Sequence, residues 1–210
     1  MKLLKSSFTA LVLYALVLGC SNVHYQEIRY KAPVVVGTYS ILFDANISEL
    51  GRVRISKAIA NSQRTFPMTA VPLTLFVYND YVASGNLSEA IMAAVLYNTN
   101  SKEIKMVATP AFYVSNEFKR NHIVAHEMVH AYLYTKGLGI TGDDCDIFMQ
   151  ERIAYGATLK ITPKRSKLWM ETLYYMAEYD AKIKENSCDE ERFNQFHEEF
   201  KGYEQQVATN

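Results

Sequence analysis

The stretch HIVAHEMVHAYLY, residues 122–134, decides how the rest of the chain is interpreted. It predicts the centre of a helix over residues 117–135, because Asn116 can cap the start and Gly137 follows the last turn. Apolar side chains fill much of this helix, so we expect it to pack in a protein core. The same helix would carry three histidines, with Glu127 directly after the second of them.

Two histidines of this stretch have the spacing of metal ligands. Residues four apart on a helix lie on one face, about 6 Å apart along the axis. His126 and His130 can therefore both direct a ring nitrogen at one ion about 2.0–2.1 Å away. Glu127 lies about 100° further round the helix and can take a proton from water beside that ion. The alternative is an amphipathic helix with solvated histidines, and we expect His122 at the surface or supporting the site.

Residues 102–160 resemble the gluzincin arrangement of zinc metallopeptidases, in which a strand, an HExxH helix and a second helix with a glutamate form the site. The matching residues are HEMVH and the Glu-x-x-Ala of Glu151 to Ala154. The resemblance implies a small zincin-like mixed sheet, with residues 102–109 as the edge strand that pairs with substrate. It also implies peptide-bond hydrolysis by a zinc-bound water, with Glu127 as general base. The implied Zn²⁺ ligands are His126, His130 and Glu151.

Other third ligands remain open at this point. The metzincin pattern is excluded, because Leu133 and Lys136 stand where it needs a glycine and a third histidine. An aspzincin-like site would use one of three aspartates in the loop after the helix: Asp143, Asp144 and Asp146. These aspartates could instead cap the next helix, a role that suits Asp146 in particular. Glu151 could instead be a solvated helix charge paired with Arg152 or Lys160.

Tyr155 is a candidate catalytic residue, because it lies one turn beyond Glu151 on the predicted second helix. Its hydroxyl could donate a hydrogen bond to the oxyanion that forms during hydrolysis. The alternative is a core tyrosine. Some gluzincins have an aspartate at this position to orient a histidine, so the sequence departs from their pattern here.

The first residues are typical of a targeting segment. Residues 1–19 combine a cationic start with an apolar run of about twelve residues, which is too short to span a bilayer. Val17-Leu18-Gly19-Cys20 resembles a bacterial lipobox, which implies cleavage before Cys20, acylation of that cysteine with chains such as palmitate, and a tether over residues 20–32. Ser21 fits sorting to an outer membrane, facing the periplasm. The alternative is an ordinary signal peptide with an incidental cysteine.

Export changes how the other two cysteines are interpreted. With Cys20 lipidated, Cys145 and Cys188 form an even pair in an oxidising compartment, which favours a disulfide. The alternative is two buried thiols.

The pattern of predicted elements indicates an α+β fold with an active-site helix and a helical C-terminal half. Residues 31–43 predict one strand, or two around Gly37, and helices are expected beyond residue 146, with breaks near Pro163 and Asn186. The other predicted elements are a helix over 47–66, a strand over 73–79, a helix over 87–98, a turn over 98–101 and a strand over 102–109.

The sequence therefore predicts a zinc metallopeptidase domain over residues 33–210, anchored to a membrane through an N-terminal lipid, with peptides or proteins as substrates. Lys+Arg and Asp+Glu both count 22, so no basic excess points to nucleic acid. Two alternatives are a non-catalytic zinc-binding envelope lipoprotein and a zinc amidase acting on cell-wall peptides.

Overall fold

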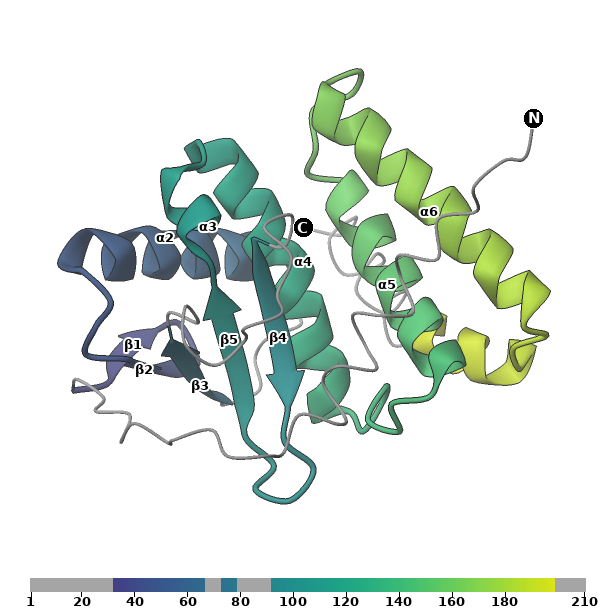
Figure 1. Cartoon of the computed structure of the whole chain (residues 1–210), viewed down its shortest axis with the longest axis horizontal. Helices are drawn as coiled ribbons and strands as arrows, with labels where there is room; N and C mark the ends of the chain where they lie inside the picture. Colours follow the sequence, from purple (N-terminus) through teal and green to yellow (C-terminus); the bar gives the residue numbers. More distant parts are fainter. Residues whose placement is uncertain (1–31, 67–72, 79–91, 199–210) are drawn as a thin grey trace, which may run out of the picture.

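The computed structural model describes residues 32–66, 73–78 and 92–198. In this part the chain forms an α+β fold, with a five-stranded mixed sheet followed by a helical C-terminal half (Figure 1). The predicted signal peptide, Cys20 and all but the last residue of the tether lie outside the described residues. No helix of the described part is long and apolar enough to cross a membrane.

The sheet has the strand order β1-β2-β3-β5-β4. Gly37, with a φ of +58°, turns the chain between β1 (Val34–Val36) and β2 (Tyr39–Phe43). Of the two predicted possibilities for residues 31–43, one strand or two, the structure has two. β2 runs parallel to β3 (Leu73–Tyr78), and β3 runs parallel to β5 (Ile104–Ala108). β5 is antiparallel to β4 (Ala93–Tyr97). The predicted strands at 73–79 and 102–109 are thus confirmed.

The prediction of a helix over residues 87–98 is wrong for the described residues 92–98, because Ala93–Tyr97 forms strand β4. Tertiary pairing overrides the local helical pattern: a turn over 98–102 folds this segment back along β5. The Asn98 side chain accepts hydrogen bonds from the backbone N–H groups of Asn100 and Ser101, which supports that turn.

The edge strand is also not the one predicted. β5 lies between β3 and β4, and β4 ends the sheet among the described strands. The correction follows from the error at 87–98, because a helix there would have left β5 without a partner on that side. The edge next to the histidine helix is therefore β4, which contacts α4 (Glu117–Thr135) directly.

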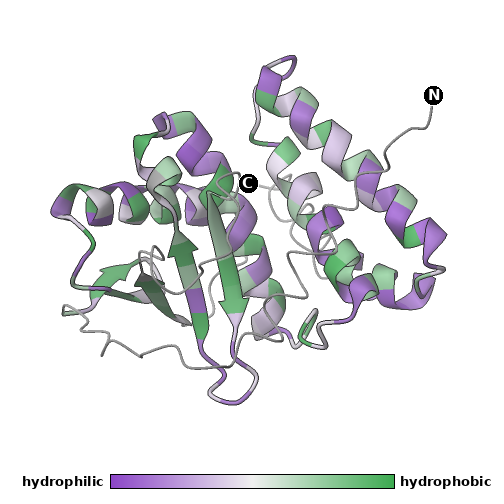
Figure 2. Ribbon diagram, in the orientation of Figure 1, coloured by the Kyte–Doolittle hydropathy of each residue, from purple (hydrophilic) through white to green (hydrophobic). Residues whose placement is uncertain are grey.

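Two helices cover the sheet with apolar side chains. α2 (Glu49–Thr65) begins at its N-cap Ser48 and buries Ile55 and Ile59. α4 begins at its N-cap Asn116, whose side chain accepts from the Lys119 N–H, and so confirms the predicted helix. Both helices join the core of the sheet, which includes Phe43, Leu75 and Met106. Figure 2 shows the apolar character of the strands at this core.

The opposite side of α4 packs against the helical half. α5 (Asp144–Leu159) buries Met149 and Ile153 against Val129 and Leu133 of α4 in a second core. α6 (Lys167–Glu185) packs on α5, and a last helical segment covers 190–198. Figure 1 shows α4 between the sheet on one side and α5 and α6 on the other. The predicted breaks near Pro163 and Asn186 are confirmed.

The start of α5 is joined to the C-terminal segment by two links. Cys145 and Cys188 form the predicted disulfide, with their Cα atoms 5.5 Å apart. One residue further on, the buried carboxylate of Asp146 accepts two hydrogen bonds from Arg192, at 2.5 and 2.7 Å. These links hold the first turn of α5 in place, five residues before Glu151.

Removing the disulfide should destabilise the protein. Replacing both Cys145 and Cys188 by serine opens a loop of 43 residues, and the chain-entropy model gives a loss of about 3–4 kcal/mol in the free energy of unfolding. The measurement is urea denaturation followed by circular dichroism. Dithiothreitol should destabilise the wild type to a similar extent and leave the double variant unchanged. Equal stability of wild type and double variant would contradict a stabilising bridge.

Candidate metal centre

α4 places two imidazoles side by side. His126 and His130 are one turn apart and both are buried, with 8 % and 6 % of their surface exposed. Their Nε2 atoms lie 3.2 Å apart. Two nitrogen ligands of one tetrahedral zinc ion, each about 2.0–2.1 Å from it, would be about 3.3 Å apart. The two rings therefore already have the separation that a shared ion requires.

α5 brings a carboxylate to the same point. The Glu151 carboxylate lies 3.2 Å from His126 Nε2 through one oxygen and 3.5 Å from His130 Nε2 through the other. The three ligand atoms lie within 4.8 Å of one another, and this His-His-Glu group could hold a metal ion. Two imidazole nitrogens and one carboxylate oxygen form a common ligand set of catalytic zinc.

Gln150 orients His130, and sequence reasoning did not identify it. Its side-chain N–H donates to the Gly139 carbonyl at 2.9 Å, which fixes its oxygen as the acceptor for His130 Nδ1 at 3.3 Å. Gly139 has a φ of +73°, and a Cβ there would lie 1.9 Å from the Gln150 side chain. The only sequence signal was the position directly before Glu151, on a helix expected to face the histidines.

This hydrogen bond determines the tautomer of His130. Because Nδ1 carries the proton, Nε2 presents its lone pair to His126 Nε2 and to Glu151. A lone pair and a carboxylate so close together need a cation among them. That cation is either a proton on His126 Nε2 or a metal ion bound by the three side chains. Metal binding would therefore displace one proton from the site.

The charge states agree with this arrangement. Burial lowers the pKa of His130 to about 4, which keeps it neutral at pH 7. Burial opposes the charged forms of His126 and Glu151, but their hydrogen bond and mutual attraction raise the pKa of His126 and lower that of Glu151. A neutral histidine and an ionised glutamate are the forms that bind metals.

Glu127 points from α4 toward the edge of the sheet. One of its carboxylate oxygens accepts a hydrogen bond from the Val95 N–H of β4 at 2.8 Å. The side chain is buried, and burial raises its pKa to about 7, although His126 and the Val95 N–H act in the opposite direction. Its carboxylate is outside the three-ligand group but close enough for its pKa to be influenced by His126 and Glu151.

Two tyrosines adjoin the centre. The Tyr155 ring is 4.4 Å from the His126 ring and stacks on Tyr175 and Tyr179 of α6. Burial, reinforced by Glu151, raises the pKa of Tyr155, so its hydroxyl stays a neutral donor. Tyr134, which sequence reasoning missed, lies one turn beyond His130; burial, then Glu127 and Glu151, raise its pKa to about 12. The helical spacing 126, 130, 134 was the signal that could have identified it.

The loop aspartates have structural roles. Asp143, and not Asp146, is the N-cap of α5, because its side chain accepts from the Asp146 N–H. Asp146 is fully buried and bound to Arg192, and Asp144 is exposed. None of them belongs to the His-His-Glu group. His122 is buried rather than at the surface, and its Nδ1 bonds to Thr162 Oγ1 at 2.9 Å.

Comparison of the chain with protein-family models, curated proteins and solved structures finds no match. The site is therefore interpreted from its own geometry.

The His-His-Glu group makes a direct prediction about metal content. Purified full-length protein should contain about one metal ion per chain by mass spectrometry, with zinc expected, and Glu151→Gln and His126→Ala should each lose it. Metal content should also fall in wild type equilibrated at pH 5, because protons compete for the histidines. Asp144→Asn is the matched control, because its carboxylate is exposed and outside the group.

Full metal retention in Glu151→Gln would contradict a ligand role for Glu151. Absence of metal from wild type, even after reconstitution with zinc, would contradict the site as a whole.

The Asp146–Arg192 pair predicts a pH-dependent contribution to stability. Burial opposes ionisation of Asp146, but its bonds with Arg192 and Thr141 lower its pKa below the ordinary value of 3.8. A carboxylate whose pKa is lower in the folded than in the unfolded state stabilises the folded protein at pH values above the unfolded-state pKa. This stabilisation is lost as the pH falls through the folded-state pKa. Asp146→Asn should therefore cost about 1–3 kcal/mol at pH 7 in urea denaturation, and this difference should shrink below pH 4. A loss independent of pH between 3 and 7 would contradict the ion pair, and Asp144→Asn should change little.

Proposed function

We propose that the protein is a zinc-dependent metallopeptidase. The observation that carries the proposal is the Glu127 carboxylate, which lies beside the His126–His130–Glu151 group and outside it. A zinc site that only stabilises a fold is closed by four protein ligands and has no use for an extra buried carboxylate, whereas a catalytic one keeps an open position. The arrangement supports hydrolysis over a purely structural or binding role.

In the proposed reaction, the two histidines and Glu151 would hold a zinc ion, which would supply Lewis acidity toward the scissile carbonyl and the attacking water. Glu127 takes the proton of that water and delivers it to the amine that leaves. Its pKa of about 7 suits transfer in both directions near neutral pH. Tyr155 is the candidate donor to the oxyanion, supported by its neutral phenol and its contact with His126.

The edge of β4 supports an extended peptide as substrate. Met92 and Asn98, at either end of β4, form backbone hydrogen bonds with Thr109 and Glu103. Because pairing alternates along an antiparallel ladder, the N–H and C=O groups of the odd-numbered residues of β4 point away from β5. Val95 is one of them, and its N–H meets Glu127. A peptide paired with this edge would pass beside the base and the metal ligands.

The proposal includes an exported protein anchored by lipid at Cys20, in an outer membrane facing the periplasm. The Cys145–Cys188 disulfide supports export, because such bonds persist in oxidising compartments.

The decisive variant is Glu127→Gln. It has nearly the same shape, and its side-chain oxygen can still accept from the Val95 N–H. We expect unchanged metal content and stability, and a fall in kcat on unstructured protein substrates of about 10²–10⁴-fold, because the base is lost. Cleavage is followed by mass spectrometry of the products, with protein and peptidoglycan substrates in parallel.

Undiminished cleavage by Glu127→Gln would contradict the mechanism. Release of peptides from peptidoglycan, with none from protein substrates, would replace the peptidase by an amidase with the same catalytic groups. Metal-loaded wild type that cleaves neither would favour a non-catalytic zinc-binding lipoprotein.

A further inference from the structure

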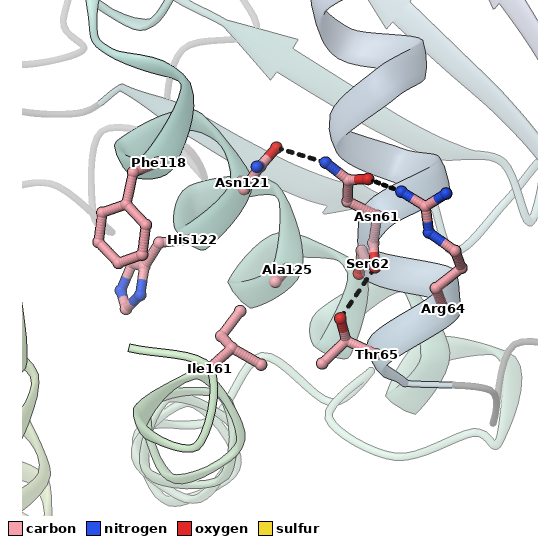
Figure 3. A pocket seen from close by; sticks show the side chains of 9 residues that line it. All are labelled: Asn61, Ser62, Arg64, Thr65, Phe118, Asn121, His122, Ala125 and Ile161. Atoms are coloured by element: carbon pink, nitrogen blue, oxygen red, sulfur yellow. Dashed lines mark hydrogen bonds between the residues drawn. The ribbon is translucent and has the colours of Figure 1, made fainter. Parts of the chain in front are cut away.

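A groove separate from the metal centre lies between the C-terminal half of α2 and the N-terminal half of α4 (Figure 3). Its volume is about 330 Å³, and Ile161, just after α5, closes one side. Volumes of this size are at the lower end of the range for small-molecule sites, about 300–1,000 Å³. None of the three metal-ligand candidates lines it. The lining residues are Asn61, Ser62, Arg64, Thr65, Phe118, Asn121, His122, Ala125 and Ile161.

Two buried polar side chains line this groove with hydrogen-bonding capacity to spare. Ser62 is 2 % exposed, and its hydroxyl has no hydrogen-bond partner in the described part of the chain. A buried hydroxyl without a partner is destabilising, and a hydrogen bond to a ligand offsets that cost. His122 is 6 % exposed, and within the described residues it forms a hydrogen bond through Nδ1 alone. The Thr162 hydroxyl donates to the Thr158 carbonyl at 2.7 Å, so it accepts from His122 Nδ1, and His122 Nε2 remains an acceptor.

The remaining polar groups favour an anion. The Arg64 side chain donates to Asn61 Oδ1, and Asn61 Nδ2 donates to Asn121 Oδ1 at 3.2 Å. This chain, visible in Figure 3, uses the oxygens of both amides as acceptors and leaves N–H donors on Asn121 and on the guanidinium. Among the described residues of the lining, Arg64 is the only charged one and none is acidic.

Apolar side chains complete the groove. Phe118 lies beside His122, and Ala125 and Ile161 lie between His122 and Thr65 in Figure 3. The lining therefore offers donors for an anionic group, one buried acceptor for an N–H donor, and an apolar wall.

We infer that this groove binds a small carboxylate that carries an apolar side chain and an N–H donor, the chemistry of an N-acylated amino acid. The carboxylate is recognised by Arg64 and Asn121, the N–H by His122 Nε2, and the side chain by Phe118 and Ile161. A second hydrogen bond comes from the Ser62 hydroxyl. The site is independent of the bound metal and of the proposed hydrolysis.

The test uses N-acetyl-L-leucine as probe and full-length protein, with binding measured by ligand-observed saturation-transfer NMR. For a ligand of this size we expect a Kd on the order of 1 mM. N-acetyl-L-leucinamide lacks the carboxylate, and N-acetylglycine lacks the apolar side chain. Each should bind at least about 5-fold more weakly than N-acetyl-L-leucine. Binding must persist in protein stripped with EDTA, which separates the groove from a carboxylate held at the metal centre.

Two variants test the assigned contacts. Arg64→Gln should weaken binding of N-acetyl-L-leucine about 5-fold and remove the preference for this acid over N-acetyl-L-leucinamide. Ser62→Ala should weaken binding of both ligands. Arg165→Gln is the matched control, because Arg165 is exposed and outside the lining. Thermal melts confirm that each variant is folded. Absence of binding by wild type, equal binding of acid and amide, loss of binding with EDTA, or insensitivity to both variants would each overturn the inference.

Discussion

The contact between Glu151 and the two imidazoles of α4 is the constraint on which the rest of the site depends. A carboxylate within 3.5 Å of two buried histidine nitrogens is costly unless a cation and good geometry compensate for lost hydration. α5 must therefore be held on α4 with little freedom to shift. The second core does part of this through Val129 and Met149. The disulfide and the buried Asp146–Arg192 pair anchor the first turn of α5, and Gln150 ties its middle to Gly139.

α4 is a shared wall between two cores, and its sequence reflects this. Val124 and Met128 belong to the core of the sheet, whereas Ala125 and Val129 belong to the core of the helical half. The polar face with His126 and His130 is left at the boundary, where β4 approaches from one side and α5 from the other. Hence α4 is buried over most of its length beyond the first turn, and the side chains of His122, Glu127 and His130 have hydrogen-bond partners within the protein.

The features predictable from the sequence are those determined locally. The cap at Asn116, the stop at Gly137 and the four-residue spacing of the histidines depend only on neighbours along the chain, and the helix follows from them. The proximity of Glu151 to the histidines was expected from the resemblance. A separation of 21 residues along the chain does not by itself determine whether two side chains meet in space. The error at 93–97 has the same origin: Ala-Ala-Val-Leu-Tyr suits a helix locally, and only pairing with β5 makes it a strand. Gln150 escaped notice because its role depends on the backbone carbonyl of a distant loop glycine.

That error also concealed how the sheet and the proposed base are linked. With β4 at the edge of the described sheet, the Val95 N–H donates to the Glu127 carboxylate and so joins β4, the proposed site of peptide pairing, to the helix that carries the histidines. Burial and the Val95 N–H shift the pKa of Glu127 in opposite directions. A divalent cation beside it would favour the carboxylate further. A peptide that pairs with β4 would compete for the same N–H and free the carboxylate to face the water. In the proposed peptidase, strand pairing by the substrate and activation of the base would therefore be a single event.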